Sequence, residues 1–266
     1  MAWQTSFLGF PISVAYPLPA GLTPTRTGII PTVKPQVYLD PRPAVYFARF
    51  HERARTREPD WFYTFVRVVS YPYCRLVFRL QGVGIERVPA RGPAILAPNH
   101  FSAMDHWFTG ILLRRRVRFM AKSQLFKGPF LEFVLAHAGA FPVRRGQHDD
   151  QAITTALTIL AHNGLLVMYP EGGRSRSGQI GNRARPGIGR LALETGAPVV
   201  PVAIVGSERA RNWWRMQFPA VTVGYGEPLR FGPEPAGCKE RHQEVADDVL
   251  AAVQALHRSL SATSHR

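Results

Sequence analysis

Short apolar runs alternate with amphipathic stretches from residue 82 to the end of the chain. Apolar runs bounded by turn residues are typical of strands, and apolar residues that recur every three or four positions indicate helices. Strands that alternate with helices favour an α/β fold with a largely parallel central sheet flanked by helices. The expected strands are 94–98, 117–121, 140–143, 165–169, 199–205 and 221–225, and the expected helices are 103–113, 130–137, 151–162, 187–195 and a last helix from about residue 239.

The first 80 residues follow a different pattern. Eight prolines fall within residues 1–45 without a sustained period, which is typical of an extended, poorly ordered leader. Residues 46–58 favour a basic helix, and residues 61–80 combine aromatic and aliphatic side chains with three arginines. This mixture is typical of an amphipathic helix in a membrane interface, here bent at Pro72, although a core helix whose arginines reach solvent fits the same pattern. We expect three parts: the leader (1–45), an amphipathic helical segment (46–80) and the main domain (81–266).

The sequence does not predict a membrane span or a secretory leader. Three arginines at a bilayer centre would cost on the order of 3 kcal/mol each, and the first basic residue is Arg26, so a basic n-region is missing at the start. Cys74 and Cys238 are too few for a disulfide framework or a zinc cage, which favours a reduced, intracellular setting. We expect a peripheral membrane protein on the cytoplasmic face.

The net charge of +15 rests almost entirely on arginine, with 29 Arg against 4 Lys. A GC-rich genome explains part of this excess. The guanidinium group pairs bidentately with phosphate, so anionic lipid, phosphorylated substrates and nucleic acid are all candidate partners. A nucleic-acid-binding module is disfavoured, because the aromatic residues gather in one segment and no recognition motif is present.

Polar clusters follow the ends of three expected strands, where ligands bind in parallel α/β sheets. His100 and Asp105 follow residues 94–98, and a carboxylate that orients a histidine is the arrangement of a general base. Residues five apart do not share a helical face, so the pair meets only if a turn separates them. A chance spacing, with Asp105 serving the first helical turn, is the alternative.

Two further clusters could bind an anion. Arg144 and Arg145 follow the strand at 140–143, although a solvated charge pair is an equally good interpretation. The run Glu171-Gly172-Gly173-Arg174 follows the strand at 165–169. Its glycines permit close backbone approach to a ligand, Arg174 can hold an anion, and Glu171 can orient an arginine or accept from a hydroxyl. His106 and His137 lack the spacing of a metal site, so no metal is expected.

Taken in order, these motifs resemble the glycerolipid acyltransferase family, which includes 1-acyl-sn-glycerol-3-phosphate acyltransferase. The likeness runs from about Arg87 to Phe231. The matching blocks are His100 to Asp105 in NHFSAMD, Gly139 to Arg145 in GAFPVRR, Pro170 to Ser175 in PEGGRS, Val200 to Val202, and Lys122 in AKSQLF. Two positions depart from the family: Gly173 stands where threonine is usual, and Arg144 stands where an acidic residue or lysine is frequent.

The resemblance implies acyl transfer from acyl-CoA or acyl carrier protein to the free hydroxyl of 1-acyl-glycerol-3-phosphate, which makes phosphatidic acid. It implies that His100 is the base, that Asp105 orients it, and that no cofactor takes part. The substrate-binding residues would be Lys122, Arg145, Glu171, Gly172 and Arg174. An anionic membrane surface would be the partner, and nucleic acid would not. Another lysophospholipid or lipid acceptor, or an acyl thioesterase that uses water instead of an alcohol, remains the alternative.

Overall fold

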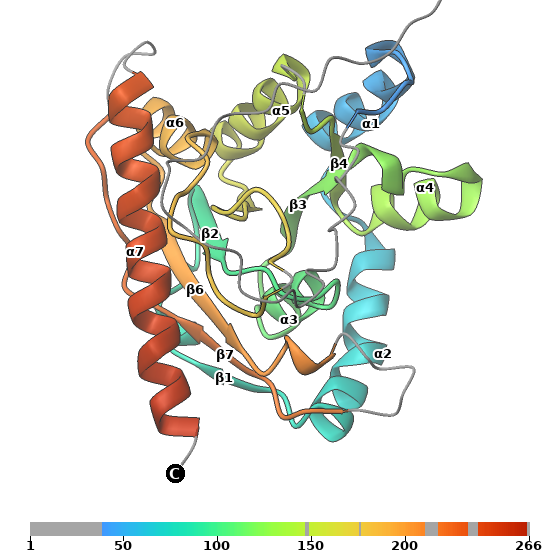
Figure 1. Cartoon of the computed structure of the whole chain (residues 1–266). Coiled ribbons are helices and arrows are strands. Elements are labelled where there is room, and N and C mark those ends of the chain that lie inside the picture. The colour runs from blue at the N-terminus through green and yellow to red at the C-terminus, as the bar shows by residue number, and fades with distance from the viewer. Residues whose placement is uncertain (1–38, 147–148, 176, 211–217, 234–238, 265–266) are drawn as a thin grey trace, which may run out of the picture. The chain divides into compact units, whose positions relative to one another are not determined.

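The computed structural model describes residues 39–146, 149–175, 177–210, 218–233 and 239–264, so nearly all of the predicted leader lies outside the described residues. Residues 38–266 form one compact unit. Within the described residues, seven strands make one sheet in the order β1-β7-β6-β2-β5-β3-β4 (Figure 1). The strands are β1 (Gln81–Val83), β2 (Ala94–Pro98), β3 (Val117–Lys122), β4 (Ala140–Val143), β5 (Leu165–Val167), β6 (Val199–Val205) and β7 (Thr222–Tyr225).

The predicted α/β fold with a largely parallel sheet is confirmed. Strand β2 lies between β5 and β6 and is buried along its whole length. The pairing of β6 with β7 is antiparallel, whereas the other neighbouring strands are parallel. Strand β1 was not predicted, because a three-residue run containing glycine carries no clear period. Since β2, β3, β4 and β5 all run in the same direction, their carboxyl ends lie at one edge of the sheet.

Helices cover both faces of the sheet (Figure 1). Helices α1, α5, α6 and α7 contribute to the core on one face, and α2 and α3 pack on the other. The last helix lies along β6 and against α6. The helices are α1 (Ala44–Thr56), α2 (Trp61–Val77), α3 (Asp105–Ile111), α4 (Gly128–His137), α5 (Asp150–Ala161), α6 (Gly187–Thr195) and α7 (Lys239–Ser264), with short 3-10 helices at Ile85–Arg87 and Ser123–Leu125.

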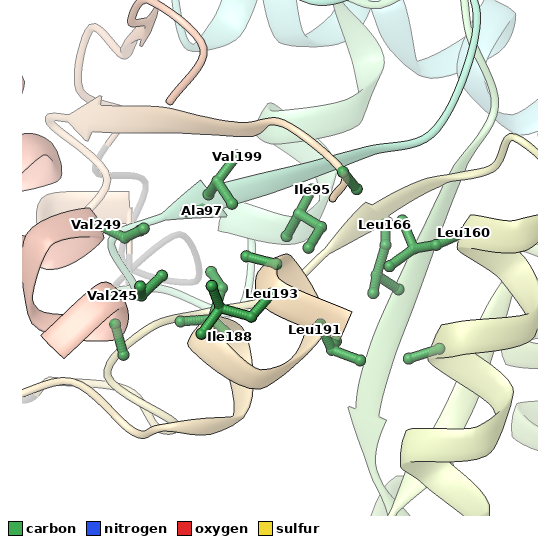
Figure 2. Packing of buried hydrophobic residues seen from close by; sticks show 14 of the residues in the cluster. Ile95, Ala97, Leu160, Leu166, Ile188, Leu191, Leu193, Val199, Val245 and Val249 are labelled. Atoms are coloured by element: carbon green, nitrogen blue, oxygen red, sulfur yellow. The ribbon is translucent and has the colours of Figure 1, made fainter. Parts of the chain in front are cut away.

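One of the two main cores lies between the sheet and helices α5, α6 and α7 (Figure 2). Ile95 of β2 faces Ile188 of α6 and Val249 of α7, and all three side chains are fully buried. Helices α6 and α7 approach closely at Gly189, where a Cβ atom would come within 2.0 Å of the His242 carbonyl oxygen. Glycine at this position therefore allows α7 to lie against α6 and to close this face of the sheet.

The segment before residue 80 contributes to the same fold. Phe78 and Leu80 are fully buried on the second face of the sheet, where the Phe78 ring lies 5.2 Å from that of Phe108. Phe47 and Phe50 of α1 are buried beside β3 and β4. The expected boundary at residue 80 therefore does not separate two cores.

Helix α2 is a single helix that contains Pro72. Its two arginines donate to backbone carbonyls of the protein, and Arg75, which was expected to reach solvent or lipid head groups, is also exposed. Arg67 donates to the carbonyl oxygen of Leu113 at 2.7 Å, and Arg75 donates to that of Leu80 at 2.6 Å. Guanidinium groups thus fix α2 to the domain. Along the described stretches, every helix is too short or too polar to cross a bilayer.

Candidate active site

The clusters singled out in the sequence lie at one edge of the sheet. His100 follows β2, Lys122 is the last residue of β3, and Arg145 follows β4. Glu171 and Arg174 lie in the loop after β5. These four strands are parallel neighbours, so the sheet brings to one edge residues that are up to 74 positions apart in the sequence.

His100 and Asp105 meet, as the turn between them requires. The His100 Nδ1 atom lies 2.9 Å from Asp105 Oδ2. The same oxygen accepts hydrogen bonds from the backbone N–H groups of Phe101 and Ser102, each at 2.7 Å. Helix α3 begins at Asp105, so the carboxylate also lies at the positive end of the helix. One carboxylate oxygen therefore closes the turn and orients the imidazole ring.

The surroundings of His100 favour a neutral ring with Nε2 available. Its ring stacks on that of Tyr169, with 4.0 Å between the centroids. Burial lowers the pKa of His100 below its usual range, and the hydrogen bond that its ring donates to Asp105 opposes that shift. Because the carboxylate accepts from Nδ1–H, the geometry assigns the proton to Nδ1 and leaves Nε2 as the basic atom.

Glu171 holds the loop after β5 against His100. Its Oε1 atom accepts from the backbone N–H of His100 at 3.2 Å, and Oε2 accepts from that of Gly181 at 3.1 Å. The backbone N–H of Ser175 in turn donates to the His100 carbonyl oxygen at 2.8 Å. Burial raises the pKa of Glu171, and these backbone donors oppose the shift. The structure thus gives Glu171 two backbone partners, and its contact with an arginine or a substrate hydroxyl stays a prediction.

Gly172 shapes the same loop. Its φ is +69°, a left-handed conformation that glycine adopts without strain. A Cβ atom there would also come within 2.7 Å of the Arg185 side chain. The structure thus explains the glycine by the turn it makes, and its approach to a ligand stays a prediction.

A hollow of about 440 Å³ lies over this loop. Glu171 and Ser175 line this hollow, and both are hydrogen-bonded to the His100 backbone. His100 therefore lies next to the hollow, behind these two lining residues. The His100 side chain itself is only 4% exposed. The lining residues are Glu171, Gly173, Arg174, Ser175, Ser177, Gln179, Ile180, Gly181, Asn182 and Arg183.

Two arginines give this region a positive charge. The charges of Arg174 and Arg145 both contribute to lowering the pKa of His100, which places the two guanidinium groups within electrostatic range of the ring. Arg145 also lines a second, larger hollow of about 1160 Å³ against α5, α6 and α7. Arg183 lines both hollows, so they adjoin. Among the described residues, Glu171 is the one carboxylate that lines the smaller hollow, beside Arg174 and Arg183, whereas several carboxylates line the larger one, so the smaller hollow is the better place for an anionic group.

Two neighbours of His100 were not predicted from the sequence. Tyr169 was assigned only to a strand, and His106 was weighed only as a metal ligand. The His106 ring lies 5.1 Å from that of His100 and 4.9 Å from that of Tyr169. Burial lowers the pKa of His106 to about 3, so this second imidazole stays neutral. Within the described ranges, no group of three or more His, Cys, Asp or Glu side chains could hold a metal ion.

Comparisons with known proteins agree on the family. Residues 79–205 match the family model described as Acyltransferase. The 1-acyl-sn-glycerol-3-phosphate acyltransferase LPAT1, chloroplastic, of Arabidopsis thaliana is 26% identical over 185 residues, which cover 67% of this chain and 50% of that protein. The 1-acyl-sn-glycerol-3-phosphate acyltransferase of Limnanthes douglasii is 27% identical over 192 residues, which cover 64% and 67%.

A solved structure has the same fold. The crystal structure of the 1-acyl-sn-glycerophosphate (LPA) acyltransferase PlsC from Thermotoga maritima matches with a TM-score of 0.56 and 22% identity, over 80% of this chain and 88% of that one. The chain spans half or less of the length of the first plant relatives it matches. Residues 79–205, which carry the His100–Asp105 pair and the Glu171–Arg174 loop, therefore belong to the acyltransferase family, in a chain that is 1-acyl-sn-glycerol-3-phosphate acyltransferase-like.

Proposed function

We propose that the protein transfers a fatty acyl group from a thioester donor to the free hydroxyl of 1-acyl-glycerol-3-phosphate and so makes phosphatidic acid. The observation that carries this proposal is the His100–Asp105 pair, with 2.9 Å between Nδ1 and Oδ2, beside a hollow lined by Arg174. A base next to an anion-binding hollow suits an alcohol that carries a phosphate. The names of the relatives support the same substrate.

In this mechanism His100 Nε2 takes the hydroxyl proton as the alcohol oxygen attacks the thioester carbonyl carbon. The new C–O bond forms, the C–S bond breaks, and the proton passes from the imidazolium to the departing thiolate. Asp105 stabilises the imidazolium through Nδ1. Arg174 and Arg145 would hold the phosphate so that the hydroxyl points at Nε2, and such orientation supplies up to about 7–11 kcal/mol of the barrier reduction.

A panel of acceptors tests the proposal. The full chain is incubated with labelled acyl-CoA or labelled acyl carrier protein and with 1-acyl-glycerol-3-phosphate, lysophosphatidylcholine or lysophosphatidylethanolamine. We expect labelled phosphatidic acid to be the main product. A different labelled phospholipid would assign another acceptor. Free fatty acid in place of phospholipid would instead identify a thioesterase, and the better of the two donors would identify the carrier.

Arg174→Ala is expected to raise the KM for the acceptor about 10- to 100-fold with a smaller change in kcat. The reason is that a hydrogen bond to a charged group is worth about 1.5–3 kcal/mol, and the exposed Arg174 lines the hollow beside His100. Steady-state kinetics with varied acceptor measure the effect. Arg209→Ala is the control, because Arg209 is exposed and its nearest carboxylate is that of Glu208 at 3.8 Å. An unchanged acceptor KM would remove Arg174 from the binding site.

The pH profile has an expected direction. The base must be neutral, so kcat/KM should fall as the pH drops through the pKa of His100 and should be flat above it. Burial places this pKa below the ordinary value of 6.5, so full activity is expected at neutral pH and loss only in the acid range. Initial rates between pH 4.5 and 8 measure it. A half-maximal rate above about pH 7 would contradict the assignment.

We also propose that the protein binds to membranes peripherally through α2. This helix contains no carboxylate, and Trp61, Phe65 and Leu76 lie exposed on its surface. Aromatic and aliphatic side chains beside basic residues favour an anionic interface. Deleting the segment cannot test this, because Phe78 and Leu80 belong to the core. Location at the cytoplasmic face stays a prediction.

A further inference from the structure

Helix α4 exposes its apolar side chains and buries its one carboxylate. A surface helix normally buries its apolar side chains and exposes its charges. In α4, Phe130 is 75% exposed, Leu131 45% and Phe133 47%. The one carboxylate of the helix, Glu132, is buried instead. An arrangement of this kind is expected where the outer surroundings of the helix are apolar.

Two contacts fix the helix in this orientation. The Tyr46 hydroxyl donates to Glu132 Oε1, and Arg49 Nη2 donates to Glu132 Oε2 at 2.6 Å. Both donors lie on α1, which packs on the sheet and on α5. A buried carboxylate without such partners would be costly, so these hydrogen bonds oppose rotation of α4 about its axis. The outward direction of the apolar face is therefore fixed by contacts within the protein.

This face continues onto α2. The Phe62 ring of α2 lies 5.5 Å from the Phe133 ring of α4, and His137 Nε2 lies 3.6 Å from Asp60 Oδ2 at the start of α2. The apolar face of the two helices consists of Trp61, Phe65, Phe130, Leu131 and Phe133, all of which are exposed. Aromatic side chains of this size expose together on the order of 400–500 Å², which is the size of a patch that marks an interaction site.

The charged residues of α2 and α4 favour a lipid surface as the partner of this apolar face. Among their residues, α2 and α4 carry two arginines and one histidine, and their only carboxylate is the buried Glu132. Lys127, immediately before α4, is exposed. Asp60, just before α2, is partly exposed and pairs with Arg53 at 2.9 Å. Aromatic rings beside basic residues, with the nearby carboxylates buried or paired, are typical of a helix in an anionic membrane interface.

The position of α4 brings this apolar face close to the active-site edge of the sheet. The helix connects β3, which ends at Lys122, with β4, which is followed by Arg145. It leaves the sheet at the edge that carries the phosphate-binding residues, so its first turn, with Phe130 and Leu131, lies on the active-site side. We propose that α4 inserts its apolar face into an anionic bilayer beside α2 and so holds this edge at the level of the lipid head groups.

The binding part of this proposal is independent of the reaction, and only the delivery of substrate rests on the proposed function. The test uses the full chain with the double variant Phe130→Glu/Leu131→Glu. Vesicles consist of phosphatidylcholine alone or with one third phosphatidylglycerol, and co-sedimentation gives the partition coefficient. Val83→Glu is the matched control, because Val83 is 48% exposed on β1, at the opposite edge of the sheet from β4.

We expect the double variant to lose about 10- to 100-fold in partition to the anionic vesicles, because two apolar side chains no longer leave water. The control should match the wild type, and both variants should keep its melting temperature, since the replaced side chains are exposed. Phe130→Ser/Leu131→Ser, which adds no charge, should shift partition in the same direction. Wild-type partition of the double variant overturns the proposal.

Two further measurements separate the alternatives. Sedimentation velocity without vesicles reports self-association: a wild-type dimer that the double variant abolishes, with vesicle binding unchanged, would assign the face to a second copy of the chain and overturn the proposal. The double variant should also acylate lysolipid in vesicles more slowly but a water-soluble short-chain acceptor at the wild-type rate. If the wild type acylates neither acceptor, the proposed function fails, and the partition result still decides the binding surface.

Discussion

Replacing His100 by alanine is expected to lower kcat about 10²- to 10⁴-fold, the contribution of a positioned general base. Nδ1 of this ring is held at 2.9 Å by Asp105, and Nε2 has no substitute among the residues identified in the site. The KM for the acceptor should change little, because the proposed mechanism assigns phosphate binding to the guanidinium groups and not to the imidazole. Single-turnover and steady-state rates with 1-acyl-glycerol-3-phosphate measure the effect.

The control for this variant is another histidine of the described chain. His162 is exposed at the end of α5 and bonds only to the carbonyl oxygen of Thr158 in its own helix, so His162→Ala should keep the wild-type rate. Because alanine at position 100 leaves the buried Asp105 carboxylate with one partner fewer, melting temperatures accompany the kinetics, and His100→Gln tests the loss of basicity with better retention of volume. Near-normal turnover of folded His100→Gln would remove the base from the mechanism.

Asp105→Asn is expected to lower kcat by about 10²- to 10⁴-fold as well, because the amide cannot stabilise the imidazolium that forms on proton transfer. The amide oxygen can still accept from Phe101 and Ser102. The amide NH₂ then occupies the place of Oδ1, which has no hydrogen-bond partner among the described residues. An unsatisfied buried donor costs about 1–3 kcal/mol, so a lower melting temperature is also expected.

The pH profile distinguishes a positioning role of Asp105 from a purely structural one. The carboxylate raises the pKa of His100 against the effect of burial. Its neutralisation should therefore move the acid limb of the profile to lower pH, and a change in stability alone would not do this. Asp248→Asn is the control, since Asp248 is exposed on α7 and lines neither of the two hollows. An unshifted acid limb with wild-type kcat would contradict the assigned role.

Much of the fold could be predicted from the sequence where a run is continuously apolar or clearly periodic. Strands β4 and β6 and helix α6 have the predicted bounds, because glycine or proline marks their ends. The reversal of β7 was not predictable, since an apolar run has no direction of its own. The outward apolar face of α4 was not predicted either, because periodicity shows that apolar residues share a side but not whether that side faces the core.

The residues of the candidate site that directly follow the ends of strands could be predicted from the sequence. The turn between His100 and Asp105 was expected from their spacing and is present. The stacking of Tyr169 on His100 was not, because it joins neighbouring strands whose order the sequence does not contain. The sequence identified Glu171 as a polar group of the site, but its backbone partners depend on how the loop returns to His100, which is a three-dimensional property.

The Oδ2 atom of Asp105 binds three donors at once, two from the backbone of the turn and one from the imidazole. The ring is consequently aligned as soon as the turn has formed, so the ordering of the base is completed during folding and is not repeated in each catalytic cycle. Local opening of residues 101–104 would release the ring together with the turn. Amide hydrogen exchange at Phe101 and Ser102 should therefore report how often the proposed base is out of alignment, even without substrate.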